Sequence, residues 1–319
     1  MKISGFTMVK NATKLYFPIK ESILSILPIV DEYVIALGDC DDDDRTLEEI
    51  TSINSPKIKI ITTIWDTQKF PKSTELARQT DIAKRACTGD WLFYLQSDEV
   101  VHEKYLTQIQ RRCQDLLNDE EVEGLLFDYI HFWGDYTHYQ VSHGWYPKEI
   151  RIVRNRPDIY PWRDAQSFRI IENFRDGDWK EYYRKENTRK LRVAKVGAEI
   201  YHYGWVRPPQ VMTGKKVNHD SLHHGQNKGK SMNILTPEEF DYGPLQYLPE
   251  FKDTHPSVMN DWINHFDWHD KLQYSGSVQE GRNLHKHEKF KNRFLTFIEQ
   301  HLLGGHQIGG FKNYKLLKK

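Results

Sequence analysis

The sequence has few of the features that mark several large protein classes. Its three cysteines, Cys40, Cys87 and Cys113, form no Cys-x-x-Cys pair, which argues against a disulfide framework or a zinc site and favours free thiols in a reducing compartment. No apolar run approaches the roughly 20 residues that cross a bilayer, and residues 1–5 lack the long apolar region of a signal peptide. We therefore expect a cytoplasmic protein.

The sequence also has no excess of charge, because 45 Lys and Arg residues balance 45 Asp and Glu residues. This balance argues against a general nucleic-acid binder, which needs a basic surface. Aromatic residues, in contrast, are plentiful, with 9 Trp and 17 Tyr among 319 residues. Such a chain can build a substantial core and is long enough for one large α/β domain with an appendage.

The first 130 residues alternate short apolar runs with helical patterns. The apolar runs predict strands over residues 3–9, 33–37, 58–63 and 91–95. The helical patterns predict helices over residues 19–27, 46–53 and 73–87, the last with Ser73 as its N-cap. This alternation predicts right-handed crossovers and a parallel sheet.

The rhythm changes beyond residue 120. Further strands are predicted over residues 124–130, 149–153 and 191–201, around an aromatic, His-rich insertion at 132–146. From about residue 207 the sequence is mostly helical and irregular, and prolines interrupt it repeatedly. We therefore expect an α/β domain followed by a helical extension.

The most informative stretch is the strand predicted over residues 91–95 and the polar residues that follow it. The strand is apolar on both faces, as a central parallel strand is, and it runs into Gln96, Asp98 and Glu99. Open α/β sheets bind ligands beyond the carboxyl ends of such strands. Asp98 is therefore predicted where a hard cation and a diphosphate are held. The alternative is that Asp98 and Glu99 begin the next helix.

Three features in this order resemble the nucleotide-sugar-dependent glycosyltransferases of family 2, which have the GT-A fold. They are the opening strand at 3–9, the acidic loop at 39–46 after the second strand, and the turn Gln96-Ser97-Asp98. The family's metal motif reads Asp-any-Asp, and this chain has Gln96 in place of its first acid. The resemblance covers about residues 2–205.

The resemblance implies a fold and an activity. The fold is a GT-A-like, Rossmann-like α/β domain over residues 1–205, whose mostly parallel sheet is flanked by helices. Its nucleotide-binding half is about 1–100 and its acceptor half about 101–205, and residues 206–319 form the helical extension. The activity is that of a metal-dependent, inverting glycosyltransferase of the hexosyltransferase type. It moves a sugar from a nucleoside-diphosphate sugar to a saccharide or lipid-linked acceptor.

The same resemblance implies roles for residues of the nucleotide half. Thr7 and Asn11 lie near the base or ribose, and Asp39 accepts a hydrogen bond from the base ring. Arg78 reaches the nucleotide, where a guanidinium offers bidentate donors to a diphosphate. Gln96 hydrogen-bonds the ribose or a metal-bound water. For any single Arg, the alternative is a surface position on an amphipathic helix.

Metal binding is expected at Asp98, with His202 as a second ligand. A divalent ion, Mn²⁺ or Mg²⁺, stabilises the charge that grows on the leaving diphosphate, and it needs few protein oxygens. His202 lies in the run 198–205, where family members place a histidine on the metal. The alternative for a lone histidine is a structural role.

Inverting transfer also needs a general base for the acceptor hydroxyl. We expect Asp164 to take the proton while Trp162 stacks on a sugar ring, with Glu172 as the alternative base.

Two other functions of the protein stay open. A non-catalytic sugar-nucleotide or glycan-binding protein on the same fold would explain Gln96. A nucleotidyltransferase would normally show a Gly-rich loop after the first strand, which residues 6–11 lack.

The C-terminal segment 282–319 departs from the overall charge balance, with nine Lys or Arg and two Glu. Its apolar residues include Phe290, Phe294 and Phe297. The composition is compatible with peripheral contact with an anionic membrane surface. The alternative is an ordinary solvated helix face.

Overall fold

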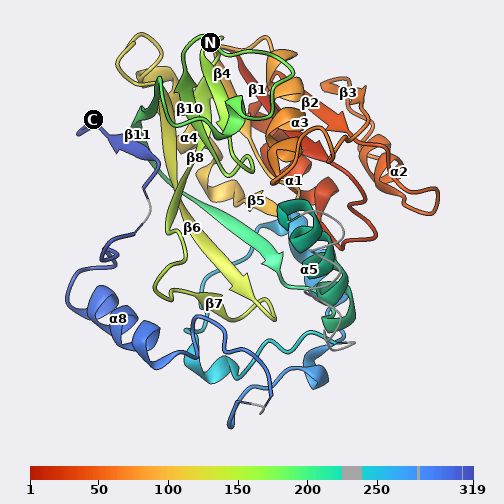
Figure 1. Ribbon diagram of the computed structural model, residues 1–319, viewed down its shortest axis with the longest axis vertical. Helices are drawn as coiled ribbons and strands as arrows, with labels where there is room; N and C mark the ends of the chain where they lie inside the picture. Colours follow the sequence, from red (N-terminus) through yellow and green to blue (C-terminus); the bar gives the residue numbers. More distant parts are fainter. Residues whose placement is uncertain (225–238, 279–280, 311) are drawn as a thin grey trace.

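The computed structural model contains one mixed β-sheet with helices packed around it (Figure 1). It describes residues 1–224, 239–278, 281–310 and 312–319. The main strands follow the order β3-β2-β1-β4-β8-β6-β11-β10-β9, with β5 and β12 on β11 and β7 on β6. The strands are β1 (Ile3–Val9), β2 (Glu32–Leu37), β3 (Ile58–Thr62), β4 (Trp91–Tyr94), β5 (Glu99–Val101), β6 (Gly124–Trp133), β7 (Tyr139–Gln140), β8 (Lys148–Arg154), β9 (Ile159–Trp162), β10 (Ser167–Ile171), β11 (Thr188–Trp205) and β12 (Tyr314–Leu316).

Helices cover both faces of the sheet and fill the C-terminal part. The α-helices are α1 (Ile19–Ile26), α2 (Thr46–Thr51), α3 (Thr74–Arg85), α4 (Leu106–Asp115), α5 (Pro209–His224), α7 (Asn260–Asn264) and α8 (Phe290–His301). Short 3₁₀ turns are η1 (Leu27–Ile29), η2 (Glu103–Tyr105), η3 (Glu181–Tyr183), η4 (Leu245–Tyr247), η5 (Ser257–Met259) and η6 (His269–Lys271). No helix of the described residues is both long and apolar enough to cross a membrane.

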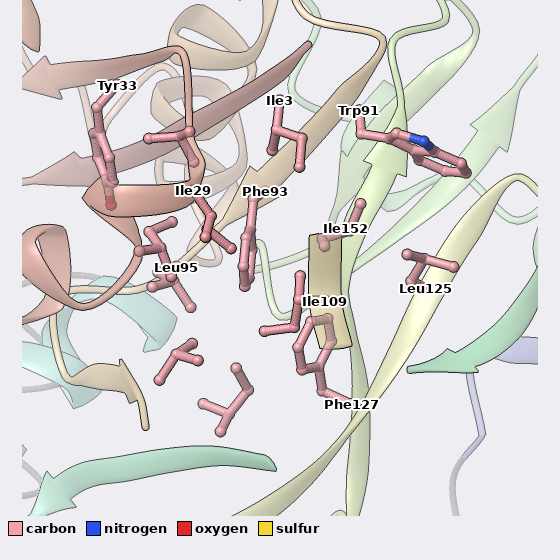
Figure 2. Packing of buried hydrophobic residues seen from close by; sticks show 14 of the residues in the cluster. Ile3, Ile29, Tyr33, Trp91, Phe93, Leu95, Ile109, Leu125, Phe127 and Ile152 are labelled. Carbon is pink, nitrogen blue, oxygen red and sulfur yellow. The ribbon is translucent and has the colours of Figure 1, made fainter. Parts of the chain in front are cut away.

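The half of the sheet formed by β3, β2, β1 and β4 is parallel throughout. Every residue of β2 and β4 is buried, because helices cover both faces of these strands. Ile3 and Val9 of β1 pack in one cluster with α1 and α4, whereas Phe6 packs in another with α3. Figure 2 shows the first cluster, in which Tyr33 and Phe93 lie with apolar residues of β6 and β8.

The other half is mainly antiparallel and contains the 18-residue strand β11. β11 runs parallel to β6, and its register shifts between Lys195 and Glu199 and again between His202 and Trp205. Gly197, with φ +78°, lies in the first irregularity. The second one places the residues after His202 at the end of β4, where the site described below is located.

The described residues after 206 pack on the ends of β6 and β11 and also contact the segment before α1 through Tyr16. The third apolar cluster of the protein joins Phe132 and Tyr203 of the sheet to Met212, Leu245 and Trp268. The chain then returns to the sheet, where β12 pairs in parallel with β11. The predicted fold class, an α/β sheet with a parallel core and a mostly helical, irregular extension, is confirmed.

Several local expectations need correction. Ser73 occupies the N-cap position of α3, but it adopts a left-handed conformation with φ 64° and its side chain makes no capping hydrogen bond. Glu99 does not begin a helix, because it is the first residue of β5. Before α2, whose N-cap position is Arg45, Asp44 Oδ1 accepts a hydrogen bond from Thr46 N at 2.9 Å.

Candidate active site

The carboxyl ends of the parallel strands meet at one edge of the sheet, and Asp98 lies there, directly after β4. Its backbone is fixed from two sides. Thr7 Oγ1 donates to Leu95 O at 2.6 Å, and Tyr203 N donates to Asp98 O at 2.8 Å. Asp98 is 7% exposed, so its carboxylate faces into the protein.

Glu99, the second acid of the pair, is fully engaged elsewhere. Arg151 donates to both of its carboxylate oxygens, at 2.7 and 2.6 Å, and the Tyr129 hydroxyl donates at 2.8 Å. Gln96 N completes the set with a hydrogen bond of 3.0 Å. Glu99 therefore shapes the turn that carries Asp98 and has little capacity left for a cation.

His202 lies opposite Asp98, with Nε2 3.7 Å from Asp98 Oδ2. Its other nitrogen, Nδ1, is 3.0 Å from Nδ1 of His131, and His131 Nε2 is 2.8 Å from the carbonyl of Tyr146. The carbonyl can only accept, so His131 carries its proton on Nε2 and its Nδ1 accepts from His202. His202 is then left with a lone pair on Nε2, directed toward Asp98.

Burial favours the neutral form of both imidazole rings, His131 and His202. It lowers the pKa of His202 and holds the pKa of His131 well below its ordinary value. A neutral imidazole oriented by a second hydrogen-bonding group is the usual form of a metal-ligating histidine. Asp98 and His202 thus present a carboxylate oxygen and an imidazole lone pair to the same small space.

Gly204 makes this arrangement possible. A Cβ at this position would lie 2.5 Å from His202 Nε2 and 2.6 Å from Asp98 Oδ2, closer than real Cβ contacts allow. The absence of a side chain therefore leaves room for the two groups to face each other.

Two basic side chains, a half-buried Lys and a buried Arg, complete the site. Lys215 on α5 places Nζ 3.5 Å from Asp98 Oδ2 and 2.5 Å from the Gly204 carbonyl, and burial lowers the pKa of Lys215 to about 7. Arg207 has 0% exposure, and its Nη1 donates to Leu15 O at 2.6 Å. Its Nε and Nη2 are buried without a hydrogen-bond partner.

The charges act on one another. Burial alone would raise the pKa of Asp98, but the neighbouring basic groups, Lys215 and Arg207 among them, hold it below its usual value. A buried guanidinium with two unused donors is costly unless an anion binds to it. The sequence prediction missed Arg207 and Lys215, because a lone Arg before two prolines and a Lys on a helix carry no local signal of burial.

Two of the residues predicted for the nucleotide half, Asn11 and Asp39, lie just after the ends of β1 and β2. Asp39 forms an ion pair with Lys10 at 2.9 Å and accepts from Trp65 N at 2.9 Å. Asn11 Oδ1 accepts from Asp41 N at 2.8 Å. Asp39 and Asn11 are thus brought to the same edge as Asp98.

Two other predicted nucleotide contacts are already occupied. The Thr7 hydroxyl is buried and donates to Leu95 O at 2.6 Å. The Arg78 guanidinium is held by both carboxylate oxygens of Glu75, at 2.9 and 2.7 Å, and by Ile64 O at 2.7 Å. Arg78 therefore fixes the loop after β3, whose Trp65 contacts Asp39.

Trp162 does not offer a ring face to a sugar. It is 3% exposed, and the guanidinium carbons of Arg163 and Arg169 lie 4.1 and 3.8 Å from its ring centroid. Its indole nitrogen donates to Arg184 O at 3.0 Å. Trp162 is a packing residue of the β9–β10 hairpin, because cations and backbone cover the surfaces that stacking would need.

The two predicted bases lie at opposite ends of that hairpin. Asp164 is half-buried in its turn, between Arg163 and Ala165, which both have φ of 62°. Glu172 is exposed and follows Ile171, whose N donates to Asp158 O. Because β8 runs antiparallel to β4, this second end lies at the amino end of β4. The structure therefore does not bring Glu172 to the edge where Asp98 lies.

Glu149, the acidic residue at the start of β8, is a site residue that was not predicted from the sequence. It is 2% exposed, its Oε1 accepts from Gln166 Nε2 at 3.2 Å, and its Oε2 has no partner. Burial raises the pKa of Glu149 to about 7, and the neighbouring charge of Asp164 adds to the rise. A Glu on the buried face of a strand is the signal that could have revealed it.

One further link connects Glu149 and Asp164 to the turn that carries Asp98. Arg151, two residues after Glu149, donates to Gln166 O at 2.9 Å and holds Glu99 with its other nitrogens. Fold and site together define an α/β protein with a buried guanidinium, a lysine, a carboxylate and an imidazole at the carboxyl edge of its parallel strands.

Comparison with known proteins identifies solved structures of low similarity. TarS from S. aureus is 14% identical over 73% of this chain and 42% of that one, with a TM-score of 0.37. Glucosyl-3-phosphoglycerate synthase from Mycobacterium tuberculosis, in complex with Mn²⁺, UDP and phosphoglyceric acid, is 19% identical over 40% of this chain and 43% of that one, with a TM-score of 0.28. The chain thus spans less than half the length of either protein. No family model and no curated protein matches.

Proposed function

We propose that the protein is a glycosyltransferase that moves a sugar from a nucleoside-diphosphate sugar to a hydroxyl of a saccharide or lipid-linked acceptor. One observation carries the proposal. The unused donors of the buried Arg207 lie in the same site as a carboxylate, Asp98, and an imidazole, His202, that present lone pairs to one space. Bound phosphates and a divalent cation are the ligands that such a combination suits.

Asp98 and His202 would hold the cation, Mn²⁺ or Mg²⁺. The described residues contain no group of three His, Cys, Asp or Glu suited to a metal, so phosphate oxygens and water would complete the coordination. When bound, the ion neutralises charge on the diphosphate. Lys215 faces the same carboxylate oxygen, so its ammonium group must move away or lose its proton when a cation binds.

Arg207 and Lys215 would bind the leaving diphosphate. Charge-assisted hydrogen bonds in a buried site strengthen as negative charge grows on the departing oxygens. Asp39 and Asn11, at the ends of β2 and β1, would contact the nucleoside. Arg78 would act through the loop that carries Trp65, since Glu75 and Ile64 O engage its Nε and Nη2 donors.

Proton removal from the acceptor is assigned to Asp164, the half-buried carboxylate of its hairpin, with Glu149 behind it. The acceptor oxygen forms a bond to the anomeric carbon while the bond from that carbon to the diphosphate oxygen breaks. The hydroxyl proton passes to the carboxylate, and in-line attack inverts the anomeric centre. Asp164 is half-buried and Glu149 is buried, and two carboxyl groups in such different environments are typical of acid–base pairs.

The test is release of nucleoside diphosphate from a panel of nucleotide sugars in the presence of a broad acceptor panel. We expect turnover by the wild type, loss of about 100-fold or more in Asp164→Asn, and a similar loss in Asp98→Asn. Asp119→Asn, at the amino end of β6, is the matched control and should keep full turnover. Donor binding without any transfer or hydrolysis would favour the non-catalytic sugar-nucleotide-binding protein instead.

A further inference from the structure

Helix α8 (Phe290–His301) packs with its polar side against the protein and its aromatic side outward. Thr296 Oγ1 accepts from His143 N at 2.8 Å, and the buried Glu299 pairs with His143 Nδ1 at 2.7 Å. Phe290, Phe294 and Phe297 are 83%, 58% and 57% exposed. A surface helix of a globular protein normally shows the reverse orientation, so this apolar side needs a partner.

The three exposed phenylalanines share one side of α8. Spacings of four and three residues place the three phenylalanines on the same side of the helix. Leu302 and Leu303, 70% and 40% exposed, add apolar surface beyond the C-terminal end of α8. We define the three phenylalanines as the aromatic face. Every Phe that is strongly exposed among the described residues belongs to it, and clusters of this kind mark interaction sites.

The charges beside the aromatic face are of one sign. The exposed charged residues of the segment 282–303 are Lys286, Lys289, Lys291 and Arg293. Its two acids are buried and paired, since Glu288 binds Arg282 and Glu299 binds His143. The surface offered by this segment is therefore apolar in the middle and basic around it.

The position of α8 leaves this surface accessible. In Figure 1 the helix lies at the periphery of the molecule, away from the parallel half of the sheet and from α5. It is joined to the body through the loop at 142–145, to which Lys286 and Gln307 also donate hydrogen bonds, at 2.8 and 2.5 Å. These bonds hold the helix while its outer side stays uncovered.

We propose that the aromatic face docks the protein on an anionic lipid bilayer. Its phenylalanines enter the boundary between headgroups and acyl chains, and Lys289, Lys291 and Arg293 pair with lipid phosphates. Aromatic and basic residues on one helix that lies in the membrane plane have this mode of binding. A second copy of the chain fits less well, because two such faces would bring two sets of basic residues together without an acid between them. The inference is independent of the proposed enzymatic activity.

The experiment is co-sedimentation of the full chain with vesicles of phosphatidylcholine alone and of phosphatidylcholine mixed equally with phosphatidylglycerol. We expect binding to the anionic vesicles about tenfold tighter than to the neutral ones, and weaker at high salt. The triple variant Phe290→Ser, Phe294→Ser, Phe297→Ser should lose this binding and keep the wild-type circular dichroism, because the replaced side chains are exposed.

A matched control replaces exposed apolar residues elsewhere, with Leu47→Ser and Ile64→Ser, which are 49% and 76% exposed. This variant should bind vesicles like the wild type. The proposal is overturned if the wild type binds neither vesicle, or if the triple variant binds as tightly as the wild type. The proposal is also overturned if light scattering shows that the wild type is a dimer and the triple variant a monomer, while neither protein binds vesicles. The face would then join two copies of the chain.

Discussion

At the scale of single residues, the site depends on how closely Asp98 and His202 approach each other. Both positions were singled out from the sequence, because Asp98 follows the strand predicted at 91–95 and His202 the strand predicted at 191–201. Arg207, Lys215 and Glu149 were not predictable. Arg207 has unused donors, Lys215 has a lowered pKa and Glu149 has a raised pKa only because the tertiary fold buries these side chains. The local sequence around them contains no sign of that burial.

Gly204→Ala tests the close approach directly. The added methyl group would meet His202 Nε2 and Asp98 Oδ2 at 2.5 and 2.6 Å, so one of them must move. We expect the affinity for Mn²⁺, measured by electron paramagnetic resonance, to fall by about tenfold or more. Gly214→Ala is the control, because a Cβ there meets nothing within 4 Å. Unchanged Mn²⁺ affinity in Gly204→Ala would contradict the assignment of these two ligands.

Glu149→Gln tests the buried carboxyl group. Its pKa is about 7 in the folded protein against an ordinary 4.5, so the folded state binds the proton more tightly than the unfolded state. This group therefore makes the free energy of unfolding decrease as pH rises from about 4.5 to 7. We expect Glu149→Gln to be more stable than the wild type at pH 8 by on the order of 2 kcal/mol, and about equal near pH 4. Urea denaturation at both pH values measures this difference, and equal effects at the two values would contradict it.

At the scale of elements, the predictions succeeded where apolar runs were long and regular. The predicted strand at 3–9 and the start of the helix at 19 coincide with β1 and α1. β5, β9, β10 and β12 were missed, since they are short and depend on pairing with the distant β11 or with each other. Such strands form because a neighbouring edge offers hydrogen bonds, and a single segment of sequence does not contain that information.

The buried pair Glu99–Arg151 ties β5 and β8 to the β9–β10 turn, and both side chains have 0% exposure. Arg151→Met leaves the Glu99 carboxylate buried without its cation, which should cost about 3–5 kcal/mol of the free energy of unfolding. Adding Glu99→Gln removes the uncompensated charge. We therefore expect the double variant to be more stable than Arg151→Met alone. Thermal unfolding of the two single variants and the double variant tests this, and purely additive losses would contradict it.

At the scale of the whole molecule, the helical extension contributes to the site rather than merely following it. Arg207 and Lys215 come from residues after 205, and Met212 and Trp268 cover Phe132 and Tyr203 of the sheet. A boundary at 205 stays a prediction about where the catalytic domain ends. A fragment of residues 1–205 would lack both cations and expose part of the third apolar cluster. We expect it to bind no nucleotide and to aggregate, as size-exclusion chromatography would show, whereas a soluble fragment that binds nucleotide would contradict this.

The most direct test of the account is calorimetric titration with UDP, GDP, dTDP and CDP, in Mn²⁺ or in chelator, on the wild type, Asp98→Ala and Arg207→Gln. The account predicts that one nucleotide binds tightly, that binding requires both Mn²⁺ and Asp98, and that Arg207→Gln weakens it about tenfold or more. Absence of binding by all four nucleotides, or binding that neither chelator nor Asp98→Ala changes, would contradict the central claim.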